Sequence, residues 1–166
     1  MNNILLTSFQ TWLPHQVSNA SDDLLEQVQQ QQLPNCSLTF LRRLPVDSQQ
    51  ASQYVLAVLD ILQSDVIVCC GMAECRKQLT VESNARCGDR RLTTAVNLNQ
   101  LVDGLDGVEV SHDAGQFVCE ALYYEVLNRA VRDRVSSRCI FVHVPPLNGD
   151  NRAEIVANFL ALLRRI

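Results

Sequence analysis

The chain has 166 residues, of which 47% are hydrophobic and 19% charged, and its formal net charge is −4 at pH 7. These values are typical of one globular domain, 1–166, and exclude a disordered chain. The negative charge argues against a nucleic-acid partner, because phosphate binding needs clustered Lys and Arg. No apolar run approaches the roughly 20 residues of a membrane span, and the first residues lack the basic region of a signal peptide. We therefore expect a cytoplasmic protein with no membrane partner.

Strand-like and helix-like segments alternate along the chain, which favours a three-layer α/β domain. The apolar runs predict strands at 3–8, 38–43, 65–70, 108–111 and 138–143. Helical spacing predicts helices at 21–32, from Asp47 or Ser48 to about 62, at 115–132 and at 151–165. Residues 72–106 show no clean period.

The segment 65–70 reads Asp-Val-Ile-Val-Cys-Cys and is followed by Gly71, which we expect to end the strand. A nearly all-apolar strand of this kind is typical of a sheet that is covered on both faces. The predicted fold class is therefore α/β: a single α/β/α domain whose sheet is mixed and mainly parallel.

Seven cysteines are present, and a reducing cytosol favours free thiols over a disulfide framework. Cys75 and Cys87 lie in polar segments where metal ligands are often found. However, no Cys-x-x-Cys pair occurs and the three histidines lack ligand spacing. We expect no metal and no cofactor, with a zinc site as the minor alternative.

One cysteine and one histidine stand out by their positions. Cys119 follows Gly115 near the start of a predicted helix, where the helix dipole and free N–H groups stabilise a thiolate. His143 ends a predicted strand, and strand ends of this kind face the crevice of open α/β sheets. With a carboxylate they form an activated thiol nucleophile. The alternatives are a buried helix cysteine and a structural histidine at a strand end.

Four segments resemble motifs of the pyroglutamyl peptidase I family, in the family's order. Residues 111–120 read Ser-His-Asp-Ala-Gly-Gln-Phe-Val-Cys-Glu, and the family carries Ser-x-x-Ala-Gly-x-Phe-Val-Cys-Asn. His143 begins the family's His-Val-Pro. Residues 71–76 resemble Gly-Gln-Ala-Gly-Gly-Arg, with Glu82 at the family's distance after the arginine, and residues 7–12 resemble Thr-Gly-Phe-x-x-Phe. The resemblance extends from about residue 3 to about residue 146.

The resemblance implies a phosphorylase/hydrolase-like domain and a cysteine peptidase that removes an N-terminal pyroglutamyl residue from small peptides through an acyl-thiol intermediate. It implies Cys119 as nucleophile, His143 as general base and acid, and Glu82 as the third member of the triad. It also implies substrate contacts, which are Phe9, Trp12, Met72, Phe117 and Val118.

Several residues depart from the family pattern. Met72 replaces a glutamine, and Glu120 replaces an asparagine beside the cysteine, where its charge is expected to raise the thiol pKa. The segment between Glu82 and 108 is shorter than the family's, which carries a hairpin used in tetramer contacts. We expect a monomer or dimer here, and expect Arg90 or Arg91 of the remnant to reach the site. The alternative function is a catalytically impaired relative that binds a small molecule or peptide.

Overall fold

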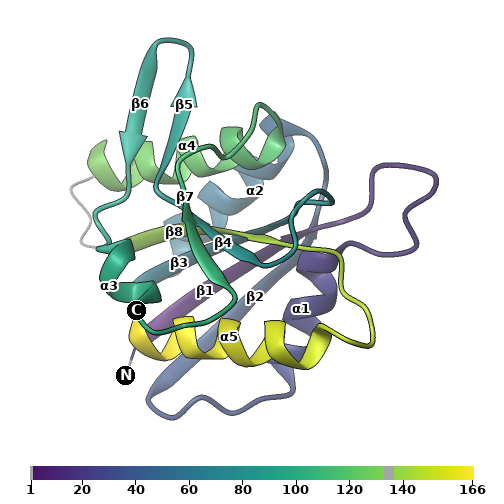
Figure 1. Ribbon diagram of the computed structural model, residues 1–166. Helices are drawn as coiled ribbons and strands as arrows, with labels where there is room; N and C mark the ends of the chain where they lie inside the picture. The colour runs from purple at the N-terminus through teal and green to yellow at the C-terminus, as the bar shows by residue number, and fades with distance from the viewer. Residues whose placement is uncertain (1, 133–136) are drawn as a thin grey trace.

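A six-stranded sheet forms the centre of the computed structural model, which describes residues 2–132 and 137–166 (Figure 1). Its strands lie in the order β2-β1-β3-β8-β4-β7. They are β1 (Asn2–Phe9), β2 (Cys36–Leu44), β3 (Val66–Met72), β4 (Leu79–Glu82), β7 (Val108–Ser111) and β8 (Arg138–Val144). Strands β2, β1, β3 and β8 are parallel, β4 runs antiparallel to β8, and β7 is parallel to β4. The predicted mixed, mainly parallel sheet is confirmed.

Helices cover both faces of this sheet (Figure 1). They are α1 (Ala20–Gln29), α2 (Ser48–Ile61), α3 (Leu98–Val102), α4 (Val118–Arg132) and α5 (Arg152–Arg165). Helices α1, α3 and α5 share one hydrophobic core with the sheet. Helices α2 and α4 share the other core with the opposite face. A separate hairpin, β5 (Asn84–Cys87) with β6 (Arg90–Thr93), projects beside α4.

The central strand β3 explains why two helix layers are needed. Val66, Val68 and Cys70 belong to the first core, whereas Ile67 and Cys69 belong to the second, as the period of two in a strand requires. All five side chains are at most 4% exposed. The apolar run 65–70 therefore belongs to a strand that is buried on both faces, as predicted.

Several predicted boundaries are wrong, including the end of α1, which is Gln29 and not residue 32. Helix α1 begins at Ala20 instead of 21, because the Asn19 side chain caps it by accepting a hydrogen bond from the Ser21 N–H. Strand β3 continues through Gly71 to Met72. Helix α4 begins at Val118 instead of 115, because Gly115 has a φ of 85°, which a helix does not allow.

Other elements match the sequence closely. Asp47 caps α2 through a hydrogen bond from the Gln50 N–H, and β7 has the predicted bounds.

The segment 72–106 contains β4, β5, β6 and α3, which no periodicity had indicated. Within residues 2–132 and 137–166, no helix has the length and apolar character that crossing a bilayer requires.

Candidate active site

Three parallel neighbours, β1, β3 and β8, end at the same edge of the sheet and place their last residues together. Phe9 closes β1, Met72 closes β3, and His143 is the next-to-last residue of β8. These three side chains line one small pocket with Cys119, which lies in the first turn of α4. The edge where strand carboxyl ends meet is the usual location of a ligand site in α/β sheets. The structure therefore brings the predicted cysteine and histidine into one site.

Strand β4 supplies the carboxylate. It pairs antiparallel with β8, so that Glu82 lies opposite Phe141 and diagonally from His143. Nδ1 of His143 is 2.7 Å from Oε1 of Glu82, and both residues are buried. In the tautomer that carries its proton on Nδ1, the imidazole donates to the carboxylate, and Nε2 is then a proton acceptor. This arrangement orients the imidazole as the second and third members of a catalytic triad do.

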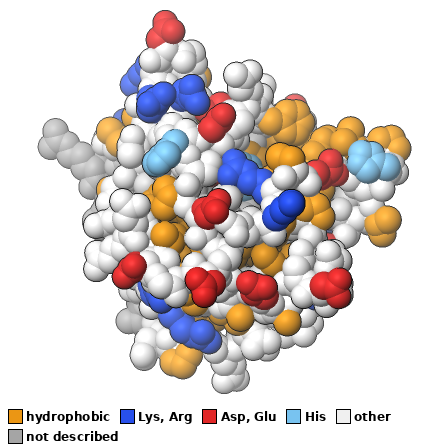
Figure 2. Space-filling view, viewed as in Figure 1, with side chains coloured by type: hydrophobic (Ala, Val, Ile, Leu, Met, Phe, Trp, Pro, Cys, Tyr) orange, Lys and Arg blue, Asp and Glu red, His pale blue; other side chains and the backbone are white. Residues whose placement is uncertain are grey.

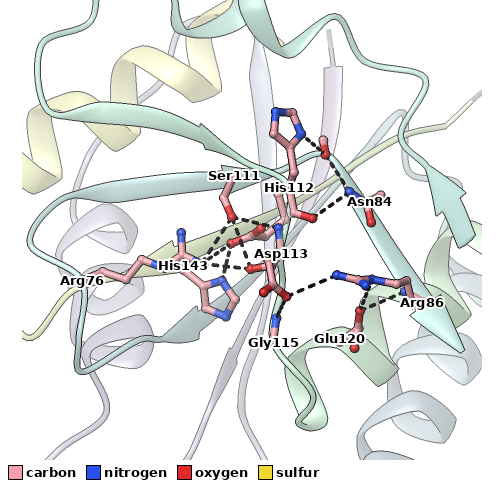
Figure 3. Close-up of polar contacts among 11 residues, drawn as sticks. Arg76, Asn84, Arg86, Ser111, His112, Asp113, Gly115, Glu120 and His143 are labelled. Atoms are coloured by element: carbon pink, nitrogen blue, oxygen red, sulfur yellow. Dashed lines mark hydrogen bonds and ion pairs between the residues drawn. The ribbon is translucent and has the colours of Figure 1, made fainter.

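Arg76 holds the same carboxylate from the other side. One of its terminal nitrogens lies 3.2 Å from Oε1 of Glu82 and donates to the Ser111 hydroxyl at 3.3 Å and to the Asp113 carbonyl at 3.0 Å (Figure 3). A charge buried as fully as Glu82 needs such partners, because leaving water costs several kcal/mol. Sequence reasoning used Arg76 only as a spacing marker and missed this contact.

The pocket beside Cys119 has a volume of about 90 Å³, several times the roughly 30 Å³ that one water occupies in the liquid. All five predicted substrate contacts line it, namely Phe9, Trp12, Met72, Phe117 and Val118. Asn19, Val46 and Ala114 also contribute, although the predicted set did not include them. The size and apolar lining suit a small, uncharged ring.

Aromatic and apolar side chains form the rim of this pocket. The rings of Trp12 and Phe117 lie 5.9 Å apart in a tilted pair. Figure 2 shows hydrophobic side chains toward the loop that follows β1, where Leu13 and Val17 are exposed. The Phe117 side chain is itself 54% exposed. Such surface groups are available to contact a bound molecule.

Two side chains that line the pocket, Met72 and Asn19, form polar contacts with other parts of the protein. Sδ of Met72 lies 3.3 Å from the Ala20 N–H at the start of α1. The Asn19 amide donates to the Gln10 carbonyl and accepts hydrogen bonds from the backbone and hydroxyl of Ser21. These side chains therefore stabilise the loop after β1, and the pocket keeps an apolar wall at position 72.

Burial controls the chemistry of the thiol. It raises the pKa of Cys119 to about 12, with further contributions from the Cys69 thiol and the charge of Glu82, while the Cys119 backbone N–H lowers it. Cys119 therefore rests as a neutral thiol. Gly71 packs against it so closely that an added Cβ would lie 2.6 Å from the sulfur. Among the described residues, no hydrogen bond joins Cys119 to His143 in this state.

The expected effect of Glu120 on the thiol is not what the structure shows. Its carboxylate accepts a hydrogen bond from the Arg86 backbone at 3.0 Å and lies 3.8 Å from Nε of the same arginine. Arg86 also approaches Asp113 at 3.6 Å (Figure 3). The neighbouring carboxylate that raises the Cys119 pKa is therefore Glu82.

The remaining candidates lie outside the pocket. Arg90 and Arg91 are exposed on the β5–β6 hairpin, and no polar contact from either to the pocket occurs among the described residues. The loop residue His112 is also exposed and bonds the Ser83 hydroxyl at 2.8 Å. Cys75 and Cys87 are exposed free thiols. In the part of the chain that the structure describes, no group of three potential metal ligands occurs.

Solved structures identify the fold. Pyroglutamyl peptidase I of Bacillus amyloliquefaciens superposes with a TM-score of 0.87 and 18% identity, over 99% of this chain and 96% of that one. The pyrrolidone carboxyl peptidase of Thermococcus litoralis gives a TM-score of 0.85 and 16% identity, over 99% and 92%. The pyrrolidone carboxyl peptidase of Fervidobacterium islandicum gives a TM-score of 0.84 and 18% identity, over 99% of this chain and 95% of that one. No known family's sequence profile matches the chain, and no curated protein is significantly similar to it. The protein therefore has the fold of the pyroglutamyl and pyrrolidone carboxyl peptidases.

Proposed function

We propose that this protein is a cysteine peptidase that hydrolyses the amide bond after an N-terminal pyroglutamyl, or similarly small, residue. The observation that carries the proposal is the 2.7 Å contact between His143 and Glu82 next to a pocket that His143 shares with Cys119. The pyroglutamyl peptidase fold and an apolar pocket of about 90 Å³ support the same reaction.

The site residues account for both halves of the reaction. In the first, the Cys119 sulfur attacks the substrate carbonyl carbon while its proton passes to Nε2 of His143. The C–N bond then breaks, the imidazolium returns that proton to the leaving amine, and a thioester remains. In the second, His143 removes a proton from water, the hydroxide attacks the thioester, and the thiol recovers its proton as the acid leaves. Glu82 stabilises the imidazolium in both halves.

The first turn of α4 supplies groups for the negative charge that develops on the carbonyl oxygen. Backbone N–H groups of a helix's first turn have no acceptor within the helix, and Cys119 is the second residue of α4. Donors of this kind stabilise an oxyanion best when they are fixed beforehand. Because the pKa of Cys119 is raised to about 12, we propose that substrate binding, and not a resting thiolate, brings the thiol proton to His143.

A second candidate is a binding protein that does not turn over its ligand. The neutral, buried thiol and the apolar Met72 in place of a side-chain amide favour it. In this case the same pocket would hold a small amide or the end of a peptide. Retention of all three triad groups in one site favours the enzyme.

The experiment is an assay of a fluorogenic pyroglutamyl amide with the wild type, Cys119→Ala and Cys75→Ala. The last variant is the matched control, since it removes an exposed thiol outside the pocket. Turnover that disappears only in Cys119→Ala supports the peptidase. Absence of turnover with saturable binding of pyroglutamate supports the binding protein, and turnover that survives in Cys119→Ala contradicts the proposed mechanism.

The partner proposed for either function is a small peptide, with the cytoplasm as location and without nucleic acid, membrane or cofactor. We also propose a monomer or dimer. The short β5–β6 hairpin, with four residues in each strand, offers little surface for association. A stable tetramer in sedimentation would contradict this expectation.

A further inference from the structure

A larger groove lies beside the small pocket. It has a volume of about 710 Å³ and is enclosed by the first half of α2, the hairpin strand β5 and the first two turns of α4. The groove opens to solvent along its length. The mechanism proposed above uses none of the residues that belong to this groove alone.

The groove is continuous with the small pocket. Val46, Phe117 and Val118 line both. Val118 and Glu120, the two neighbours of Cys119 in the chain, line the groove. The groove therefore adjoins the small pocket that Cys119 lines, although Cys119 itself does not line the groove. The small pocket is too small for a peptide, so the chain beyond the scissile bond must leave it, and the groove is the adjoining space.

The two walls of the groove differ in chemistry. Helix α2 contributes uncharged polar groups, including Ser52, Gln49 and Gln53. The Ser52 hydroxyl is buried and has no hydrogen-bond partner among the described residues, although its side chain lines the groove. That buried oxygen is out of a ligand's reach, whereas Gln49 and Gln53 are exposed, and their side-chain amides can both donate to and accept from a peptide backbone. The wall thus suits an extended main chain.

The opposite wall, at the start of α4, determines which side chains of a bound peptide fit the groove. Phe117, Val118 and Tyr124 form an apolar surface next to Cys119. Glu125 also lines the groove, and no salt bridge engages it among the described residues. The nearby charge of Glu120 is balanced by Arg86. An apolar residue therefore fits the start of the groove, and the uncompensated carboxylate disfavours acidic residues further along it.

We propose that this groove holds the peptide that follows the scissile bond, and that it prefers apolar and basic residues over acidic ones. The proposal rests on the proposed peptidase function. It assigns the substrate class as pyroglutamyl peptides with at least two further residues, in contrast to isolated pyroglutamyl amides.

The test compares kcat/KM for pyroglutamyl-Phe-Arg-Gly amide, pyroglutamyl-Glu-Glu-Gly amide and pyroglutamyl p-nitroanilide. In the wild type, we expect the Phe-Arg peptide to exceed the Glu-Glu peptide about tenfold, as in other discriminations by a few side-chain contacts. Gln53→Trp, which fills the groove from α2, should lower kcat/KM for the Phe-Arg peptide about tenfold and leave the anilide unchanged. Gln50→Trp is the matched control, because Gln50 is exposed on the same helix but does not line the groove.

Glu125→Lys provides a second variant, which should reverse the preference between the two peptides. Equal effects of Gln53→Trp and Gln50→Trp, or of Gln53→Trp on peptide and anilide alike, would overturn the groove assignment. If no pyroglutamyl substrate turns over, the proposed function fails, and calorimetric titration with Phe-Arg-Gly amide still tests the groove. Binding weakened by Gln53→Trp but not by Gln50→Trp then supports it, and absence of binding overturns it.

Discussion

Gly71 is the position where a single methyl group tests the geometry of the site most directly. A Cβ added there would lie 2.6 Å from the sulfur of Cys119 and 2.9 Å from Cζ of Phe141, where ordinary contact begins at 3.4 Å. The sulfur must therefore move away by about 0.8 Å before its distance to the new Cβ reaches ordinary contact. A misplacement near 1 Å at a reacting group can cost about 100-fold in rate, and overpacking a core costs about 1–3 kcal/mol.

We expect Gly71→Ala to lower kcat for a pyroglutamyl amide by about 100-fold and to lower the free energy of unfolding by about 1–3 kcal/mol in urea titration. The matched control is Gly149→Ala. Gly149 is exposed, and an added Cβ there meets nothing within 4 Å. This control should keep wild-type activity and change stability by less than about 0.5 kcal/mol.

The two measurements separate the possible results. A loss of stability without a loss of kcat would show that the position of the Cys119 sulfur in this packing does not matter for the reaction. Wild-type behaviour in both measurements would refute the close contact between β3 and α4 from which the expectation is derived.

Glu82→Gln should lower kcat by about 1,000-fold or more, because an amide no longer stabilises the imidazolium or fixes the proton on Nδ1. An unchanged pH–rate profile and kcat would contradict that role. Burial raises the pKa of Cys139 to about 12, whereas the unfolded thiol titrates near about 8.5. The folded state therefore keeps a proton that the unfolded chain loses, so this contribution to stability is complete below about pH 8.5 and decreases by about 1.4 kcal/mol per pH unit above it, up to about pH 12. Cys139→Val should reduce the alkaline loss of unfolding free energy by this amount, whereas the exposed Cys75→Ala should leave the loss unchanged. Iodoacetamide at pH 7.5 should modify Cys75 before Cys119, because the raised pKa leaves little Cys119 thiolate; peptide mapping that finds Cys119 first would indicate a more accessible thiolate.

The sequence by itself determined those features that depend on local patterns. The apolar run 65–70 required a strand covered on both faces, because none of its side chains suits water on either side. The sequence placed the start of α2 at Asp47 or Ser48, and Asp47 is the cap, through a hydrogen bond that involves only neighbouring residues. The resemblance of four segments to pyroglutamyl peptidase I motifs implied Cys119, His143 and a set of pocket contacts, and these residues line one pocket in the structure.

Tertiary structure decided what depends on residues distant in the chain. The antiparallel pairing of β4 with β8 brings Glu82 to His143, and the strand of only four residues carries no signal for its direction. Arg76 reaches the carboxylate through folding of the loop before β4. The raised pKa of Cys119 likewise comes from burial beneath neighbouring elements, which outweighs the helix terminus that the sequence had emphasised. A local pattern places a residue on an element, but only packing sets its depth, its partners and the charge that it carries.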